Sequence, residues 1–156
     1  MKYRRLSIEE LLPLEEDLKA FLIVNGIDGS LWENMNKNEP LKAVELIEIF
    51  SDVVLQKVYE KIRFLEHRGT TNCLIFKLES DAIELVSLEL KPTSHCDLST
   101  PESIHDALLN HSKEISFFKT EKKYSAEREM EVHQLIENGC VLSNETFWNL
   151  LQYVIS

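Results

Sequence analysis

The sequence predicts a helix-dominated α+β domain over residues 1–156, with a long central helix, one β-hairpin and C-terminal helices. Three observations lead to this prediction. Apolar residues recur at spacings of three and four along most of the chain, whereas residues 73–90 alternate or run apolar. With 156 residues, 44% of them hydrophobic, the chain can bury one sizeable core. It has no internal repeat and no linker, so we expect a single domain.

The first helix is predicted over residues 8–24. Ser7 and Glu10 have the spacing of a capping box, and the helix ends before Gly26, which suits a left-handed stop. Pro13 lacks an amide N–H and crowds the preceding turn. Either the first turn therefore bends, or the regular helix starts later.

Two more helices are predicted before the alternating segment. Ser30 and Glu33 form a second capping box, which predicts a short helix that lies over the core. The strongest helical pattern then runs from Pro40 to His67 and ends at Gly69. We expect the first half of this long helix to be central, because its apolar stripe is wide.

A β-hairpin is predicted over residues 73–79 and 82–90, where apolar positions alternate or run together on either side of a Ser80-Asp81 turn. Two strands alone are marginally stable in water. The hairpin must therefore pack on helices, gain another strand or pair with another chain. Residues 115–120 and 140–142 are the candidates for a further strand.

Three helices are predicted in the C-terminal third. Thr100 caps a helix that extends through Ile115, and Ser125 caps a helix to Asn138. Residues 145–155 form the last helix, capped by one of the two polar residues before it. This helix is too apolar to be a free tail, so we expect it to dock on another surface.

The composition disfavours several classes of protein. Twenty-seven acidic and 17 basic residues give a formal charge of −10, which disfavours binding to nucleic-acid backbones. The longest apolar run, residues 20–24, is far shorter than the ~20 residues of a membrane helix. Three widely spaced cysteines and no signal-peptide pattern are typical of a reducing cytoplasm. We expect an acidic, soluble, cytoplasmic protein with no cofactor, no nucleic-acid partner and no membrane association.

Metal ligation is the first chemistry to consider, because several ligand types gather in and after the loop of residues 92–99. The candidate ligands are His95, Cys96, Asp97 and His105. Other residues with ligand atoms are Cys73, His111, His133 and Cys140. None has the Cys-x-x-Cys or His-Glu-x-x-His spacing of zinc sites, and the chain has no nucleophile elbow. No catalytic residue is predicted, and a small enzyme or a metal- or ligand-binding protein is the alternative function.

Protein interaction without catalysis is the leading hypothesis, with a homo-oligomer or an accessory subunit as the assembly. A hairpin with open edges needs cover, and the last helix is rich in aromatic residues that can lie in a groove. The predicted anchors are Phe147, Trp148 and Leu151, because buried aromatic residues dominate interface energies. The alternative is that these three side chains close the core of their own domain.

The whole chain also resembles an uncharacterised bacterial family known only as a domain of unknown function. The resemblance is carried by Met1–Leu6, Asn25-Gly26-Ile27 with Trp32, Phe50–Val54, Glu66-His67-Arg68 and Gly139-Cys140. It implies a small bacterial cytoplasmic protein. It implies no activity, cofactor or catalytic residue.

Overall fold

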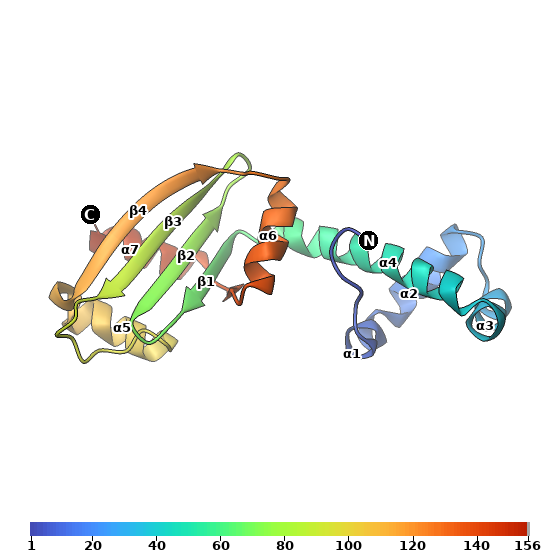
Figure 1. Ribbon diagram of the computed structural model, residues 1–156, viewed down its shortest axis with the longest axis horizontal. Helices are drawn as coiled ribbons and strands as arrows, with labels where there is room; N and C mark the ends of the chain where they lie inside the picture. The colour runs from blue at the N-terminus through green and yellow to red at the C-terminus, as the bar shows by residue number, and fades with distance from the viewer. Residues whose placement is uncertain (156) are drawn as a thin grey trace. The chain divides into compact units, whose positions relative to one another are not determined.

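The computed structural model describes residues 1–155, and the protein has the predicted α+β fold with a five-stranded antiparallel sheet. The chain divides into two compact units, residues 1–60 and the remainder from Lys61 onward. Figure 1 shows helices alone in the first unit and the sheet with its helices in the second. No helix within residues 1–155 is long and apolar enough to cross a membrane.

Helices make up the first unit. They are α1 (Ile8–Leu11), a 3-10 turn (Leu12–Leu14), α2 (Glu15–Val24), α3 (Gly29–Asn38) and α4 (Pro40–Lys61). The predicted capping box is present, since Ser7 Oγ accepts from Glu10 N and the Glu10 carboxylate accepts from Ser7 N. Pro13 lies in the 3-10 turn, which confirms that the helix is irregular there. Gly26 follows α2 with φ at +79°, where a glycine is favoured.

The second predicted capping box is wrong. Helix α3 begins one residue before Ser30, and its cap is Asp28, whose carboxylate accepts from Leu31 N at 2.8 Å. Ser30 instead donates its hydroxyl to the same carboxylate at 3.0 Å. Aspartate is as good a cap as serine, so the spacing of Ser30 and Glu33 did not decide where the helix starts.

Residues 2–6 are held along α4 by hydrogen bonds. Asp52 accepts from the backbone N–H groups of Lys2 and Tyr3, at 2.6 and 2.9 Å. Ser51 Oγ accepts from Leu6 N at 3.0 Å, and the rings of Tyr3 and Tyr59 meet edge to face at 5.0 Å. These contacts help bury Tyr3 and Leu6. Helices α2, α3 and α4 also contribute buried side chains to this unit, whereas α1 contributes none.

The sheet of the second unit has the order β4-β3-β2-β1-β5. Its strands are β1 (Phe64–Arg68), β2 (Asn72–Leu78), β3 (Ala82–Leu90), β4 (Ile115–Lys123) and β5 (Val141–Leu142). Strands β2 and β3 are the predicted hairpin, with Cys73 opposite Leu88. Both candidate additional strands are also present, since β4 pairs with β3 and β5 pairs with β1.

Strand β1 replaces the predicted end of the long helix. Helix α4 ends at Lys61, and β1 begins at Phe64 and pairs with β2. Apolar spacing alone cannot distinguish a helix from a short buried strand here. Pairing on both sides buries Leu65 completely, so tertiary contacts override the helical pattern. His67 and Arg68 consequently lie on a strand rather than at the end of the long helix.

The remaining helices are α5 (Pro101–Asn110), α6 (Arg128–Glu137) and α7 (Glu145–Ile155). Thr100 caps α5 as predicted, but the helix ends before Ile115, which begins β4. Ser125 does not cap α6, because its N–H and its hydroxyl both donate to the Glu131 carboxylate. Helix α7 has the predicted bounds, and Asn144 Oδ1 accepts from Phe147 N at 2.8 Å.

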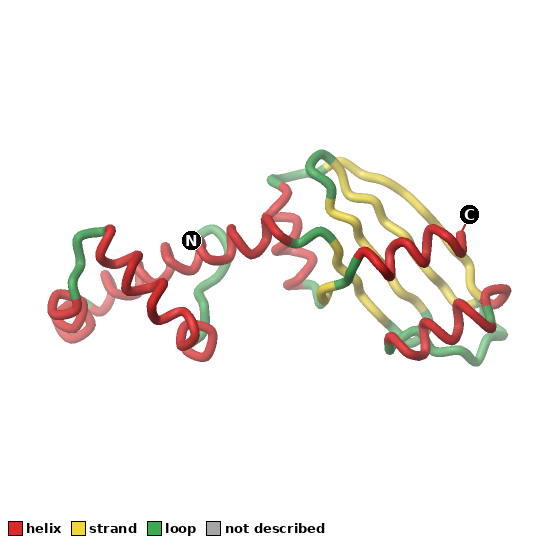
Figure 2. Tube along the Cα trace, turned by 180° about the vertical axis from the view of Figure 1, so that it is seen from behind, coloured by secondary structure: helices red, strands yellow, loops and turns green. Residues whose placement is uncertain are grey.

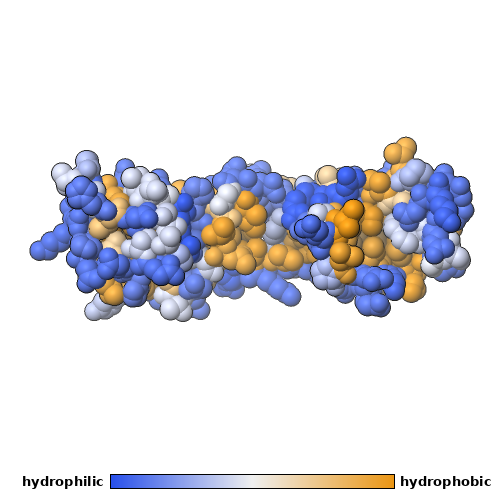
Figure 3. Space-filling view, turned by 90° about the horizontal axis from the view of Figure 1, so that it is seen from below, coloured by the Kyte–Doolittle hydropathy of each residue, from blue (hydrophilic) through white to orange (hydrophobic). Residues whose placement is uncertain are grey.

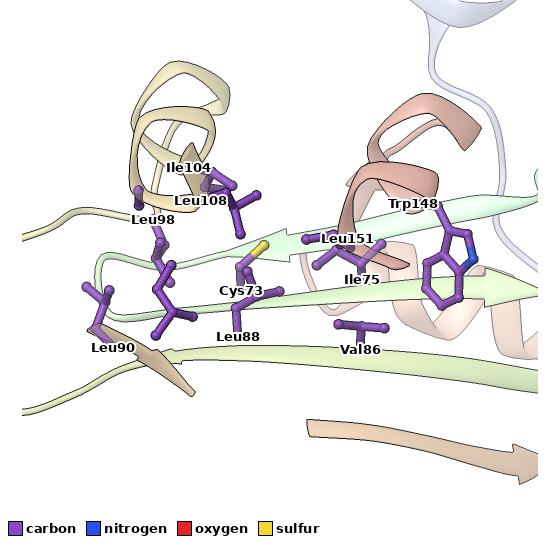
Figure 4. Packing of buried hydrophobic residues seen from close by; sticks show 12 residues of the cluster. Cys73, Ile75, Val86, Leu88, Leu90, Leu98, Ile104, Leu108, Trp148 and Leu151 are labelled. Carbon is purple, nitrogen blue, oxygen red and sulfur yellow. The ribbon is translucent and has the colours of Figure 1, made fainter. Parts of the chain in front are cut away.

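Helices α5 and α7 cover one face of the sheet, as Figure 2 shows from that side. Side chains from β2, β3, α5 and α7 meet between these layers, and Figure 4 shows them pointing toward one another. Leu98, from the loop before α5, is fully buried in the same cluster. The core therefore extends to the end of the sheet where that loop leaves β3.

Candidate functional site

A surface pocket of about 410 Å³ lies beside this core. It is formed by the loop between β3 and α5, by α5 itself and by the connection from α5 to β4. The lining residues are His95, Cys96, Asp97, Ser103, Asp106, His111 and Glu114. Three of the four residues predicted as metal ligands thus line one pocket.

The β3–α5 loop is anchored on both sides of Cys96. Leu98 N donates to Thr70 O at 3.0 Å, and the Leu98 side chain is fully buried. On the other side, Ser94 Oγ accepts from Cys96 N at 3.1 Å, and Ser94 N donates to Lys91 O at 2.9 Å. These bonds fix the backbone that carries the thiol.

His111 and Glu114 reach the pocket because α5 ends there. His111 is the residue after the helix, and its N–H still donates to Ala107 O. A single 3-10 turn follows, in which Glu114 N donates to His111 O at 2.9 Å. Glu114 O then accepts from Lys91 N at 2.8 Å. That bond joins this turn to the start of the loop that carries Cys96.

The three side chains lie close together. One His111 nitrogen, Nδ1, is 2.8 Å from Glu114 Oε2, and Cys96 Sγ is 4.0 Å from the same oxygen. One potential ligand atom from each residue lies within 4.8 Å of the other two. Cys96 and Glu114 are half-buried, whereas His111 is exposed.

The arrangement fits a tetrahedral zinc site. Zinc–ligand bonds of about 2.0 to 2.3 Å place neighbouring tetrahedral ligand atoms about 3.3 to 3.7 Å apart. The distances of 2.8 and 4.0 Å to the Glu114 oxygen lie on either side of this range. Small side-chain movements would bring both to it. Thiolate, imidazole and carboxylate are also the three ligand types that zinc takes in proteins.

The other polar residues of the pocket have different positions. Asp106 Oδ2 is 3.9 Å from His111 Nε2, where it can orient the imidazole. Asp97 accepts from the N–H and the hydroxyl of Ser99, so its carboxylate belongs to a local turn. His95 is exposed at the rim. His105 is exposed on α5 and lies outside the pocket.

Sequence reasoning found Cys96 but missed its two closest partners. His111 entered only as a residue with ligand atoms, and Glu114 did not enter at all. The signal that could have identified them is His111-Ser-Lys-Glu114, a histidine and a carboxylate three residues apart where a helix ends. A single turn at that point places both side chains on one side.

The other two cysteines are poor candidates for metal binding. Cys73 is fully buried, and burial raises the pKa of its thiol to about 12, with a further increase from the Glu66 carboxylate that Arg68 opposes. Burial likewise raises the pKa of the Cys140 thiol. Deprotonation, which metal binding requires, is therefore costly at both positions.

The residues predicted to anchor a partner lie in or against the core. Trp148 is 3% exposed and Leu151 is fully buried, and both point toward the sheet in Figure 4. Phe147 is partly buried and packs against the same cluster. These positions match the alternative interpretation, in which the three side chains close their own core.

Comparison with known proteins gives the family. No curated protein and no solved structure matches the chain. A family model, described as a family of unknown function, matches residues 1–156. This match confirms the resemblance found in the sequence, and the chain belongs to this family of unknown function, DUF6495.

Proposed function

We propose that the protein binds a divalent transition metal ion, zinc above all, through Cys96 Sγ, an imidazole nitrogen of His111 and a carboxylate oxygen of Glu114. The observation that carries the proposal is the presence of a thiol, an imidazole and a carboxylate within 4.8 Å of one another in one pocket. Three protein ligands leave a fourth position for water or a small ligand.

The simplest alternative is an ion pair between His111 and Glu114. These residues are three positions apart, and both side chains are more than a third exposed. Exposed pairs of this kind contribute about 0–1 kcal/mol, so an ion pair gives little reason for the arrangement. It also leaves the half-buried Cys96 thiol beside the same carboxylate unexplained. A bound metal ion would account for all three side chains.

Zinc titration calorimetry on the untagged full chain tests this proposal. We expect one site per chain, with affinity that falls as the pH is lowered, because the thiol must lose its proton. Cys96→Ser and His111→Gln should each weaken zinc binding at least about 100-fold, since loss of a ligand costs more than loss of a residue that only orients a ligand.

The matched control is His105→Gln, because His105 lies on α5, shortly before His111, but outside the pocket. It should bind zinc as the unaltered chain does. Absence of zinc binding in the unaltered chain would contradict the proposal. An equal loss in His105→Gln and His111→Gln would also contradict it.

A second candidate function is interaction with other protein chains, in a bacterial cytoplasm as the sequence predicts. It is supported by strand β4, which ends the sheet and has no further strand beside it among residues 1–155. Phe118 on this strand is 64% exposed, although it is a large aromatic residue. Open edges and exposed aromatic residues are features of surfaces that bind other chains. Fast hydrogen exchange of the outward amides of β4 in dilute solution is the expected result.

A further inference from the structure

We infer that β4 pairs with β4 of a second copy of this chain, antiparallel and centred on Thr120. The inference rests on the interaction function proposed for this edge and is independent of metal binding. It names the partner and the register. Three properties of β4 carry it: the direction of its backbone groups, the order of its charges and the partners of its lysines.

Hydrogen bonds at the end of β3 establish which backbone groups of β4 face outward. Leu90 N donates to Thr71 O, toward β2, and Lys91 N donates to Glu114 O, toward β4. Directions alternate along a strand, and the register of β3 with β4 continues this pattern. The β4 residues with outward N–H and C=O groups are therefore Ile115, Phe117, Lys119, Glu121 and Lys123.

The charges select one register for two antiparallel copies. Outward residues must face outward residues, so the twofold axis passes through a residue of β4. An axis at Thr120 places Lys119 opposite Glu121 of the second copy, and it also places Glu121 opposite Lys119 of the second copy. Axes at Lys119, Glu121 or Lys122 instead place a charge opposite itself. An axis at Phe118 leaves no pair of opposite charges within β4.

Lysines on an edge strand commonly prevent such pairing, but two of the three lysines of β4, Lys119 and Lys122, have compatible partners. Lys119 Nζ donates to Gln152 Oε1 at 2.8 Å, and an ammonium group has two further protons for Glu121 of the second copy. Lys122 Nζ lies 3.7 Å from a carboxylate oxygen of Glu131 in its own chain. Neither of these two lysines must therefore give up its present partner when two copies pair.

The experiment is sedimentation equilibrium of the full chain over a wide range of concentration. The unaltered chain should show a concentration-dependent monomer–dimer equilibrium. Glu121→Lys should raise the dimer dissociation constant at least about tenfold, because two attractive pairs become repulsive. The charge-swapped double variant, Lys119→Glu with Glu121→Lys, should restore dimerisation, because it rebuilds both pairs with reversed polarity.

Two results would overturn the inference: an unaltered chain that stays monomeric throughout, or a Glu121→Lys chain that dimerises as tightly as the unaltered one. Hydrogen exchange separates this failure from failure of the interaction function. In a monomer, the amides of Lys119 and Glu121 should exchange fast, and those of Phe118 and Thr120, which face β3, slowly. A monomer with fast outward amides contradicts self-pairing alone, whereas slow outward amides in a monomer contradict an open edge as well.

Discussion

The two units bury their apolar side chains in different ways. In the second unit, helices on a sheet enclose residues such as Leu65, Ile75 and Leu151, which have no exposed surface. The first unit also buries large side chains, such as those of Phe50 and Tyr59. Many large apolar residues of that unit reach the surface, among them Ile8, Leu12, Ile23, Val24, Leu41 and Ile49. On the side seen in Figure 3, hydrophobic patches alternate with hydrophilic residues.

This difference shows what stabilises each unit. A sheet covered by helices removes whole side chains from water, and each contributes about 1.5–3 kcal/mol. Helices packed around α4 leave one side of each in solvent, so hydrogen bonds that tie residues 2–6 to α4 matter more there. Substitutions in the core should therefore dominate in the second unit, and loss of polar contacts should dominate in the first.

The largest effect is expected in the second core. Leu151→Ala should lower the free energy of unfolding by about 2–5 kcal/mol, because it leaves a cavity under α7. Asn149→Ala, at an exposed position of the same helix, should change it by less than about 0.5 kcal/mol. Urea unfolding measures both variants. Similar losses in the two would contradict the placement of α7 on the sheet.

A smaller effect on stability is expected when a cysteine in the core is compared with the cysteine in the pocket beside it. Cys73→Ser should cost about 1–3 kcal/mol, because it places a hydroxyl in a dry core. Cys96→Ser should cost less than about 0.5 kcal/mol, since that side chain faces solvent in part. Urea unfolding compares the two, and thiol labelling of the native chain should modify Cys96 well before Cys73. Equal labelling rates would show that Cys73 is not enclosed.

In the first unit, Asp52→Ala should cost about 1–2 kcal/mol, because two backbone N–H groups lose their acceptor. The amides of Lys2 and Tyr3 should then exchange faster with solvent. Glu45→Ala, at an exposed position of the same helix, is the matched control and should leave that exchange unchanged. If both variants exchange alike, the N-terminal segment is held by its side chains instead.

The smallest expected effect is on the stability of the fold at low pH. The Arg4 guanidinium, helped by Ser7 N–H, lowers the pKa of Glu10 to about 2 from its usual 4.5. A carboxyl with a lowered pKa stabilises the fold above about pH 4.5, and this stability is lost as the pH falls toward 2. Because the side chain is 40% exposed, we expect less than about 1 kcal/mol. Glu10→Gln should remove this part of the pH dependence, and an unchanged acid profile would contradict the assignment.

Local signals predicted most elements of both units. The capping box at Ser7, the alternation that marks β2 and β3, and the apolar pattern of α7 all lie within short stretches of sequence. The prediction of a helix was wrong for residues 64–68. Their strand exists only through pairing with β2 and β5, which are separate segments of the chain. The spacing of apolar residues within a segment does not indicate which other strands pair with it.

Only one part of the pocket could be predicted from the sequence. The loop around Cys96 was identified by its mixture of histidine, thiol and carboxylate. Its partnership with Glu114 depends on where α5 ends and on the bond between Lys91 and Glu114. The sequence predicts a helix that continues through Ile115, which would keep both His111 and Glu114 within it. The end of α5 at Asn110 is what brings His111 and Glu114 to Cys96.

The most direct test of metal binding is the absorption spectrum of the protein with cobalt(II), which takes the place of zinc and absorbs light. A tetrahedral cobalt centre with one thiolate should give visible bands and a sulfur-to-metal charge-transfer band. The charge-transfer band should persist in Cys140→Ser and disappear in Cys96→Ser. A spectrum without that band in the unaltered chain, or one that survives in Cys96→Ser, would contradict the proposed centre.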